Sequence, residues 1–164
     1  MLSLVVHAAL GVAVVWLVVA SNPQIFRRPA SGPLFSPLEL VLYGLGLASV
    51  AVGWFFNIRF VLENTDGWLT NPLWGDGSWA QYLQLIFDNP AAGSVSGDFT
   101  IANVLVLPVV TIIHGRRVGV RRPILFFVSS LFMSFSFAWT FYLATVERQR
   151  RLETAAVPAE ASVS

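Results

Sequence analysis

The sequence contains no cysteine and no lysine, and charged residues make up only 12% of its 164 residues. Without cysteine the chain has no disulfide, no thiolate metal ligand and no cysteine nucleophile. An ordinary soluble domain has roughly 25% charged residues, so a soluble fold of this length would lack the polar coat it needs. The net charge of +1 gives no reason to expect a nucleic-acid partner.

The common catalytic and cofactor-binding patterns are also missing. The chain has no glycine-rich phosphate loop, nucleotide-binding fingerprint or Ser-His-Asp arrangement. Its two histidines, His7 and His114, lie in different apolar segments, and we expect them at opposite membrane faces, where they cannot share a metal ion. We therefore predict no metal site and no cofactor, and His7 is interpreted as a packing residue bonded to a carbonyl.

Long apolar segments are what the sequence has instead, because hydrophobic residues make up 55% of it. A helix needs about 20 residues, at about 1.5 Å each, to cross ~30 Å of hydrocarbon. Candidate spans lie at about 2–20, 38–61, 96–114 and 124–146. The sequence therefore predicts an all-α integral membrane bundle of about four transmembrane helices over residues 1–152, followed by a disordered tail at 153–164.

Two of these spans need comment. A cleaved signal peptide would have a basic segment before a shorter apolar stretch, whereas Arg27 and Arg28 follow the first span, so we interpret it as a retained helix. The third span is strictly apolar only over 99–113. It must recruit residues 94–98 or lie in thinned bilayer, and Pro108 should kink it.

The arginines predict the orientation, since basic loops are retained in the cytoplasm. Loop 21–37 has two arginines, loop 115–123 has four, and loop 62–95 has none. We therefore expect the first two loops to be cytoplasmic, loop 62–95 to be extracytoplasmic and both termini to be outside a bacterial plasma membrane. The tail contradicts this pattern with Arg148, Arg150 and Arg151.

Loop 62–95 contains one helical pattern. Apolar residues recur at i, i+3, i+4, i+7 and i+8 from Trp79, after the N-cap candidate Ser78 and before the breaker Asn89-Pro90. This spacing predicts a short interfacial helix. Its aromatic residues Trp79 and Tyr82 are candidates for contact with lipid or with a partner.

Small residues at helical spacing occur in the second and fourth spans. They are Gly44, Ala48, Ser49 and Gly53 in one, and Ser130, Ser134 and Ala138 in the other. Such residues let helix backbones approach closely. We interpret them as packing within one chain, with an oligomer seam as the alternative, and Asn57 and Asn103 as candidates for interhelical hydrogen bonds.

A group of carboxylates is expected near one membrane face. Glu63 and Asp66 follow the second span, Asp98 lies near the start of the third, and Arg59 is one helical turn before Glu63. In the structural interpretation Arg59 neutralises Glu63 or Asp98, and Asp98 caps the third helix. The alternative is a site that binds a proton, a cation or a lipid headgroup.

A second polar group follows the third span, where Gly115 is predicted to end the helix. Its arginines are Arg116, Arg117, Arg121 and Arg122. They are suited to contact the phosphates of anionic lipids. The alternative is that they only fix the membrane orientation.

The order and spacing of several short motifs resemble a known family. The motifs are Trp54-Phe55-Phe56 with Glu63-Asn64, Leu85 to Pro90, Asp98, Gly115-Arg116-Arg117 with Gly119, and Ser136-Phe137-Ala138 with Tyr142-Leu143. Over about residues 45 to 150 the chain resembles the small bacterial membrane proteins of the family "domain of unknown function 2834". The resemblance implies a compact helical membrane protein and no activity. Residues 70–79 look like an enlargement relative to that family, and the first span looks like an addition.

The sequence therefore favours a non-catalytic accessory or interaction subunit. Its expected partners are membrane lipid and another membrane protein or a second copy of the chain, and the candidate contact residues include Trp54 and Arg59 besides those above. The alternative is a membrane-embedded isomerase or cyclase acting on an isoprenoid or other hydrophobic substrate. Glu63, Asp66 and Asp98 would then be acid and base, and Trp54 would stabilise positive charge.

Overall fold

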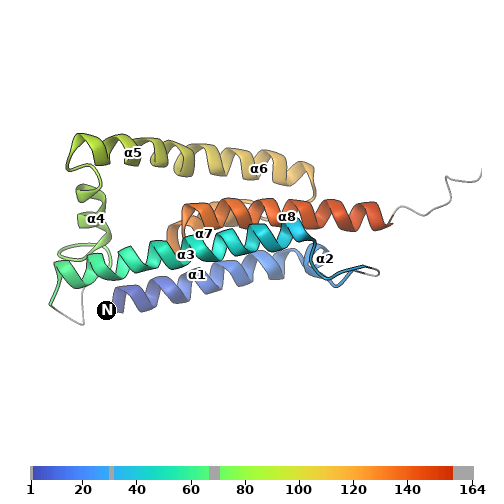
Figure 1. Cartoon of the computed structure of the whole chain (residues 1–164), viewed down its shortest axis with the longest axis horizontal. Helices are drawn as coiled ribbons and strands as arrows, with labels where there is room; N and C mark the ends of the chain where they lie inside the picture. Colours follow the sequence, from blue (N-terminus) through green and yellow to red (C-terminus); the bar gives the residue numbers. More distant parts are fainter. Residues whose placement is uncertain (1, 30–31, 67–70, 157–164) are drawn as a thin grey trace, which may run out of the picture.

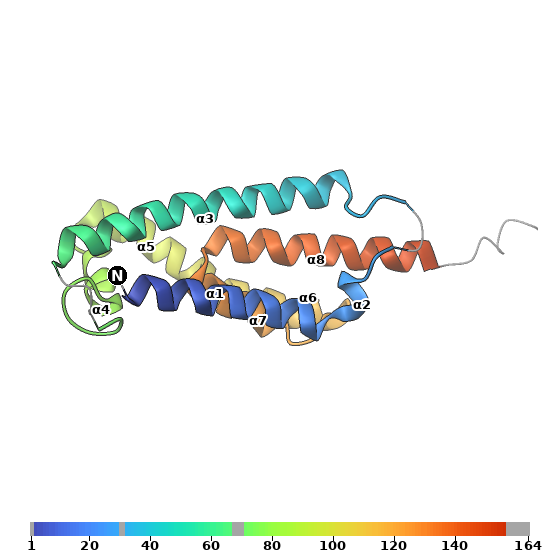
Figure 2. The same cartoon turned by 90° about the horizontal axis from the view of Figure 1, so that it is seen from below.

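A computed structural model describes residues 2–29, 32–66 and 71–156 of the chain. Its helices are α1 (Leu2–Ser21), α2 (Pro23–Phe26), α3 (Pro37–Asn64), α4 (Trp79–Leu85), α5 (Pro90–Thr100), η1 (Ile101–Val106), α6 (Leu107–Arg117), α7 (Ile124–Phe132) and α8 (Phe135–Ala156). These described residues include no strand, so the predicted all-α class is confirmed. The long helices run side by side along one axis (Figures 1 and 2).

Three helical stretches are long and apolar enough to cross a membrane: Leu2–Ser21, Pro37–Asn64 and Pro90–Arg117. The first two agree with the predicted first and second spans. α3 begins with a reciprocal cap, because Ser36 Oγ accepts from the Glu39 amide at 3.1 Å and the Ser36 amide donates to Glu39 Oε2 at 2.8 Å. Pro37 follows at the first helical position, where a missing N–H has no cost.

The third stretch is longer than predicted. It starts at Pro90, where Asn89 caps the helix by accepting from the Ala92 amide at 2.9 Å. Asn89-Pro90 therefore begins this helix as well as ending the segment before it. Asp98 lies two turns inside α5, so the prediction that it caps the third helix was wrong.

The third stretch changes its hydrogen bonding halfway along, just before Pro108. In η1 the helix widens to a π-helix, and the Leu107 amide bonds Ala102 O, five residues earlier. Proline cannot donate the bond that an α-helix would need at this place. The expected disturbance at Pro108 is therefore taken up by the turn before it.

The predicted fourth span is not one helix, and a fourth transmembrane helix is not confirmed. The chain leaves the α-helical conformation at Met133 (φ −100°, ψ −85°), and Ser134 starts α8 by accepting from the Phe137 amide at 3.0 Å. α7 and α8 therefore form a hairpin (Figure 2). α7 has nine residues, about 14 Å of helix, which is half of a ~30 Å hydrocarbon layer.

The turn of this hairpin lies against the middle of the two neighbouring helices. Ser134 Oγ is 2.7 Å from the hydroxyl of Ser49, in the middle of α3. A Cβ placed on Gly11, in the middle of α1, would lie 2.8 Å from Met133 Sδ. The hairpin thus reaches only halfway along the bundle.

Small residues bring α3 and α8 together, as expected for packing within one chain. A Cβ placed on Gly46 would lie 2.7 Å from Thr140 Oγ1, and one on Gly53 would lie 3.9 Å from Ser134 Cβ. Ala138 is fully buried. Gly44, in contrast, has no neighbour within 4 Å and is exposed.

The buried core lies in the half of the bundle that contains the hairpin. It joins residues of α1, α2, α7, α8 and the segment after α6, namely Val18, Ile25, Val120, Phe126, Phe137, Phe141 and Tyr142. In the other half, α4 and α5 have no fully buried residue. The hairpin therefore determines where the bundle is densely packed.

The predicted interfacial helix is present as α4, with Ser78 Oγ accepting from the Gln81 amide at 3.3 Å. Trp79 Nε1 donates to His7 Nε2, which joins this helix to α1. The other ring nitrogen of His7 is 2.7 Å from Ser3 O, in agreement with the predicted carbonyl bond. At the C-terminus, α8 continues to Ala156, four residues into the predicted tail, and residues 157–164 lie outside the described part of the chain.

Candidate functional site: the arginine end of the bundle

Three segments far apart in the sequence meet at one end of the bundle, which we call the basic end: residues 21–29 with 32–37, residues 115–123 and residues 147–152. The buried side chain of Asn22 joins the first two. Its Oδ1 accepts from the Arg121 amide at 2.7 Å, and its Nδ2 donates to Val18 O at 2.8 Å and Arg121 O at 3.1 Å. The loop after α6 is thereby fixed against the end of α1.

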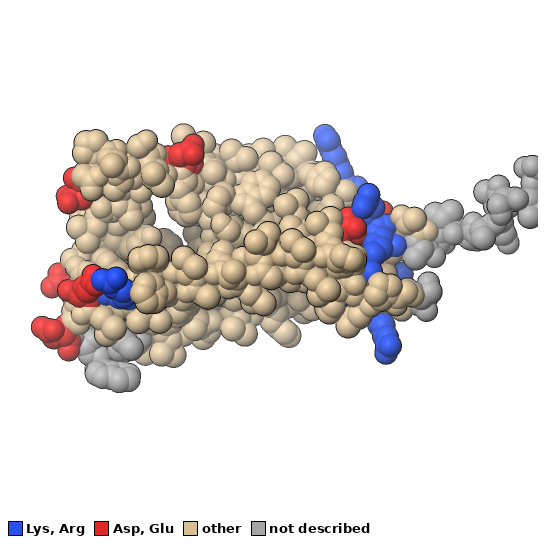
Figure 3. All heavy atoms as spheres, in the orientation of Figure 1, with Lys and Arg blue, Asp and Glu red and all other residues tan. Residues whose placement is uncertain are grey.

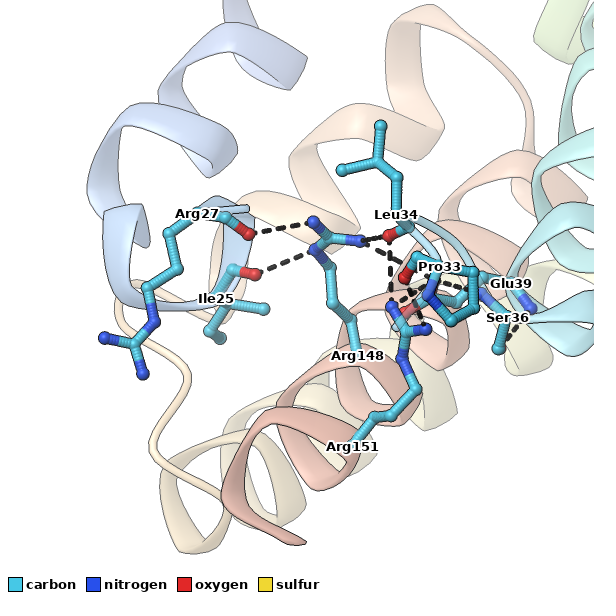
Figure 4. Close-up of polar contacts among 8 residues, drawn as sticks. All are labelled: Ile25, Arg27, Pro33, Leu34, Ser36, Glu39, Arg148 and Arg151. Atoms are coloured by element: carbon cyan, nitrogen blue, oxygen red, sulfur yellow. Dashed lines mark hydrogen bonds and ion pairs between the residues drawn. The ribbon is translucent and has the colours of Figure 1, made fainter. Parts of the chain in front are cut away.

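Arg148 joins the third segment to the first. Its guanidinium donates to Ile25 O at 2.8 Å, Leu34 O at 2.8 Å and Arg27 O at 3.0 Å (Figure 4). Only 3% of the Arg148 side chain is exposed, and its Cζ lies 5.3 Å from the centroid of the Phe35 ring. A planar group with five donors is suited to three carbonyls at once.

Glu39 provides the negative charge in this group. Its carboxylate is fully buried, and Oε2 lies 3.2 Å from Arg151 Nη2 and 3.6 Å from Arg148 Nη1. Arg151 also donates to Pro33 O at 3.1 Å and Leu34 O at 3.0 Å. We call Arg148, Arg151, Glu39 and these carbonyls the Arg148 network. It holds the end of α8 against the loop between α2 and α3.

The tail arginines therefore lie at the same end as the two basic loops. Nine of the ten arginines are at the basic end: Arg27, Arg28, Arg116, Arg117, Arg121, Arg122, Arg148, Arg150 and Arg151. The predicted fourth crossing would have separated the tail arginines from these two loops. In Figure 3 most blue side chains gather at the end where α8 leaves the bundle, and most red ones lie at the opposite end.

Six of these arginines form no ion pair or side-chain hydrogen bond with any described residue. They are Arg27, Arg28 and the four predicted contact residues Arg116, Arg117, Arg121 and Arg122, and all six are exposed. The other three use their charge within the protein, since Arg150 pairs with Glu147 at 2.9 Å. The basic end thus has three arginines that are paired within the protein and an outer set of six exposed arginines without such partners.

The segment 115–123, which contains four arginines of the outer set, departs from the prediction in one respect. The helix passes through Gly115 and ends at Arg117, and the left-handed residue after it is Gly119 (φ 76°). Gly115 is instead a packing position, because a Cβ there would lie 3.0 Å from Pro123 Cβ. The neighbouring His114 has its Nδ1 2.6 Å from the hydroxyl of Tyr142, which joins α6 to α8.

The predicted carboxylates are not gathered around a common space. Glu63 pairs with Arg59 at 2.6 Å, and both side chains are more than half exposed. Asp66 is exposed after α3, and Asp98 is exposed on α5. In the described part of the chain no three histidine or carboxylate side chains are placed to hold a metal ion.

The three predicted aromatic contact residues have different surroundings. Trp79 bonds His7, and Tyr82 packs edge-on against Phe60 with the ring centroids 5.4 Å apart. Trp54 is half-buried in α3, and its Nε1 has no hydrogen-bond partner among the described residues. Tyr82 nevertheless remains 40% exposed, and Trp54 retains an unused donor.

One comparison decides which family these features belong to. The model of the family described as protein of unknown function DUF2834 matches residues 41–148, more than half of the chain. The chain belongs to DUF2834. The DUF2834 match begins inside α3 and ends at Arg148, so α1 and Glu39 lie outside the matched residues. No curated protein and no solved structure matches the chain.

The contacts of the Arg148 network were not predicted from the sequence, although one signal for Glu39 was present. Ser36-Pro37 followed by glutamate at 39 has the spacing of a capping box, which places Glu39 at a helix start. Its second role, as the partner of Arg148 and Arg151, depends on a separation of more than 100 residues. No local pattern indicates such a contact.

Proposed function

We propose that this member of DUF2834 is a non-catalytic membrane subunit whose basic end binds the phosphate groups of anionic lipids. The observation that carries the proposal is the outer arginine set, which is exposed, positively charged and unpaired with any described residue. Four of its members lie within seven residues, two at the end of α6 and two in the loop after it. Guanidinium groups bind phosphate oxygens with two parallel hydrogen bonds, so a group of four is well suited to a lipid headgroup.

The same arrangement supports an orientation. With nine arginines at one end, the rule for basic loops assigns this end to the cytoplasm. The chain would then cross the membrane three times, with α7 and α8 as a re-entrant hairpin that enters and leaves on the cytoplasmic side. The N-terminus and the loop that contains α4 would be extracytoplasmic, and the C-terminus cytoplasmic.

The structure gives the enzymatic alternative no geometric support. Acid and base catalysis on one substrate needs two groups directed at a common space. Glu63 is engaged by Arg59, and Asp66 and Asp98 are exposed on different elements. The proposed function therefore includes no reaction.

Interaction with another membrane protein is a second candidate, and the surface of the opposite end favours it. There Leu73 is 57% exposed and Trp74 is 69% exposed, and Leu83 and Phe87 of the α4 region are exposed as well. Exposed apolar groups beside the headgroup layer are used both for lipid and for protein contacts. Co-purification from native membranes, followed by mass spectrometry, would identify a stoichiometric partner of this surface.

The lipid proposal is tested with purified full-length protein in detergent, to which phosphatidylglycerol or phosphatidylcholine is added. Native mass spectrometry should show preferential binding of phosphatidylglycerol. The variant R116Q/R117Q/R121Q/R122Q should lose this preference about tenfold or more, since each arginine near an anionic surface contributes about 1 kcal/mol. R59Q, which changes an exposed arginine at the opposite end, is the control. Equal phosphatidylglycerol binding by the quadruple variant and the unmodified protein would reject the proposal.

A further inference from the structure

Residues 124–146 are long enough to cross a membrane but are folded back on themselves. They contain no charged residue, no glycine and no proline. As one helix they would be about 34 Å long, which is enough for a hydrocarbon layer of ~30 Å. In the structure they form the α7–α8 hairpin instead (Figure 2). Something other than apolar length therefore selects the hairpin.

The turn of the hairpin has little support from its own sequence. Phe132, Met133 and Ser134 form it, and it lacks glycine, proline, asparagine and aspartate, which favour turns most. Ser134 caps α8 by accepting from the Phe137 amide at 3.0 Å. A turn in hydrocarbon also interrupts the regular backbone bonding that a straight helix keeps. The hairpin therefore depends on contacts made elsewhere.

One short segment of the chain holds both ends of the hairpin at the basic end. Before α7, the backbone of Arg121 forms two hydrogen bonds with the buried side chain of Asn22, at 2.7 and 3.1 Å. Near the end of α8, Arg148 donates to the carbonyl of Ile25 at 2.8 Å, three residues after Asn22 (Figure 4). The ends of a straight helix over 124–146 would lie about 34 Å apart. Both contacts can therefore form together only in the hairpin.

The Arg148 network is the part of these contacts that a straight helix would have to break. Arg121 could stay at Asn22, because α6 ends nearby, but Arg148 and Arg151 would have to leave the loop between α2 and α3. Five hydrogen bonds to backbone carbonyls would be lost. Glu39, which is fully buried, would lose both of its cations. Since an unpaired buried charge is costly, the network opposes the straight helix.

We propose that the Arg148 network is a latch that keeps residues 124–146 folded back. When its arginines are released, this stretch becomes a fourth transmembrane helix and the C-terminus moves to the opposite side of the membrane. Arg150 is outside the latch, because its side chain is 74% exposed and pairs with Glu147. The inference rests on the proposed orientation, in which the basic end is cytoplasmic, and goes beyond it by assigning a second arrangement to the C-terminal third of the chain.

The latch is tested by labelling single cysteines of the full chain in intact cells with a membrane-impermeant maleimide. Thr154→Cys, which is exposed near the end of α8, reports the side of the C-terminus. Asp76→Cys, in the exposed loop before α4, reports insertion of the rest of the bundle. The variant Arg148→Gln/Arg151→Gln opens the latch and removes two positive charges. We expect it to raise external labelling of Thr154→Cys at least tenfold and to leave that of Asp76→Cys unchanged.

Arg150→Glu is the matched control, since it changes the charge of the tail by the same amount and leaves the latch intact. In this control Thr154→Cys should stay protected from external labelling. External labelling in both variants would assign the effect to charge alone, and protection in both would show that the hairpin needs no latch; either result would overturn the proposal. External labelling of Thr154→Cys without any arginine change would instead reject the proposed orientation, and the latch with it.

Two single changes serve if the double variant does not insert, which a loss of Asp76→Cys labelling would show. Arg151→Gln weakens the latch but leaves the three carbonyl bonds of Arg148 in place. Arg150→Gln removes the same charge outside the latch. We expect external labelling of Thr154→Cys to be at least threefold higher in Arg151→Gln than in Arg150→Gln. Equal labelling in these two variants would overturn the proposal.

Discussion

Replacement of Arg148 by methionine should destabilise the protein severely. The change removes the guanidinium that donates to Ile25 O and Arg27 O, and these carbonyls have no other side-chain donor in the described structure. It also removes one of the two cations beside the fully buried Glu39. Removing one partner from a buried charged pair costs about 3 to 5 kcal/mol. Each carbonyl that loses its partner costs about 1 to 3 kcal/mol, which leads to a similar total.

The free energy of unfolding can be measured by titrating the purified protein from mild detergent into SDS while following helix content. We expect a loss of about 3 to 5 kcal/mol for Arg148→Met. Arg150→Met is the matched control two residues away, because the Arg150 side chain is 74% exposed, and exposed ion pairs contribute at most about 1 kcal/mol. A loss below about 1 kcal/mol for Arg148→Met would refute the assigned role of the Arg148 network.

Further predictions concern helix packing and follow from single contacts. Gly46→Val should destabilise the protein by about 1 to 3 kcal/mol through overpacking, because a Cβ at this position meets Thr140 and Phe137. Gly44→Val is the control and should be nearly neutral, because Gly44 has free space beside it. Equal unfolding free energies of the two variants would contradict the α3–α8 contact. Tyr142→Phe should cost about 1 kcal/mol by removing the hydrogen bond to His114, and no further loss is expected when His114→Phe is added, which a double-mutant cycle checks. Trp79→Phe should increase hydrogen exchange in α4 relative to α6, since it removes the bond to His7 that joins α4 to α1, and unchanged exchange would show that this bond does not hold α4.

The sequence predicted those parts of the fold that depend on local patterns. Apolar length located α1 and α3 within a few residues, and the Ser78 cap with its apolar spacing located α4. The predicted third span was too short, because residues 90–98 are mostly small and only weakly apolar. In the structure these residues are helical, between the Asn89 cap and η1. Hydropathy measures how favourably a residue transfers from water to lipid. It therefore does not show where a helix begins when its first residues lie outside the hydrocarbon.

The main error concerned residues 124–146, which are apolar throughout but form a hairpin with a turn at Ser134. An apolar stretch long enough to cross a membrane can also enter and return, and the decision depends on distant partners. Here these partners are Ser49 for the turn and Glu39 for the end of α8. For the same reason only part of the candidate site was predicted. The four arginines of segment 115–123 could be identified from their spacing, whereas the roles of Arg148 and Asn22 depend on tertiary contacts.

The measurement that tests the proposed topology most directly is labelling of single cysteines, for which a chain without native cysteine is well suited. Asp76→Cys lies in the exposed loop before α4, and Thr154→Cys is exposed on the last turns of α8. In intact cells, a membrane-impermeant maleimide should label Asp76→Cys, and it should label Thr154→Cys only after the membrane is permeabilised. Labelling of both positions from the same side would contradict the re-entrant hairpin and restore a fourth crossing.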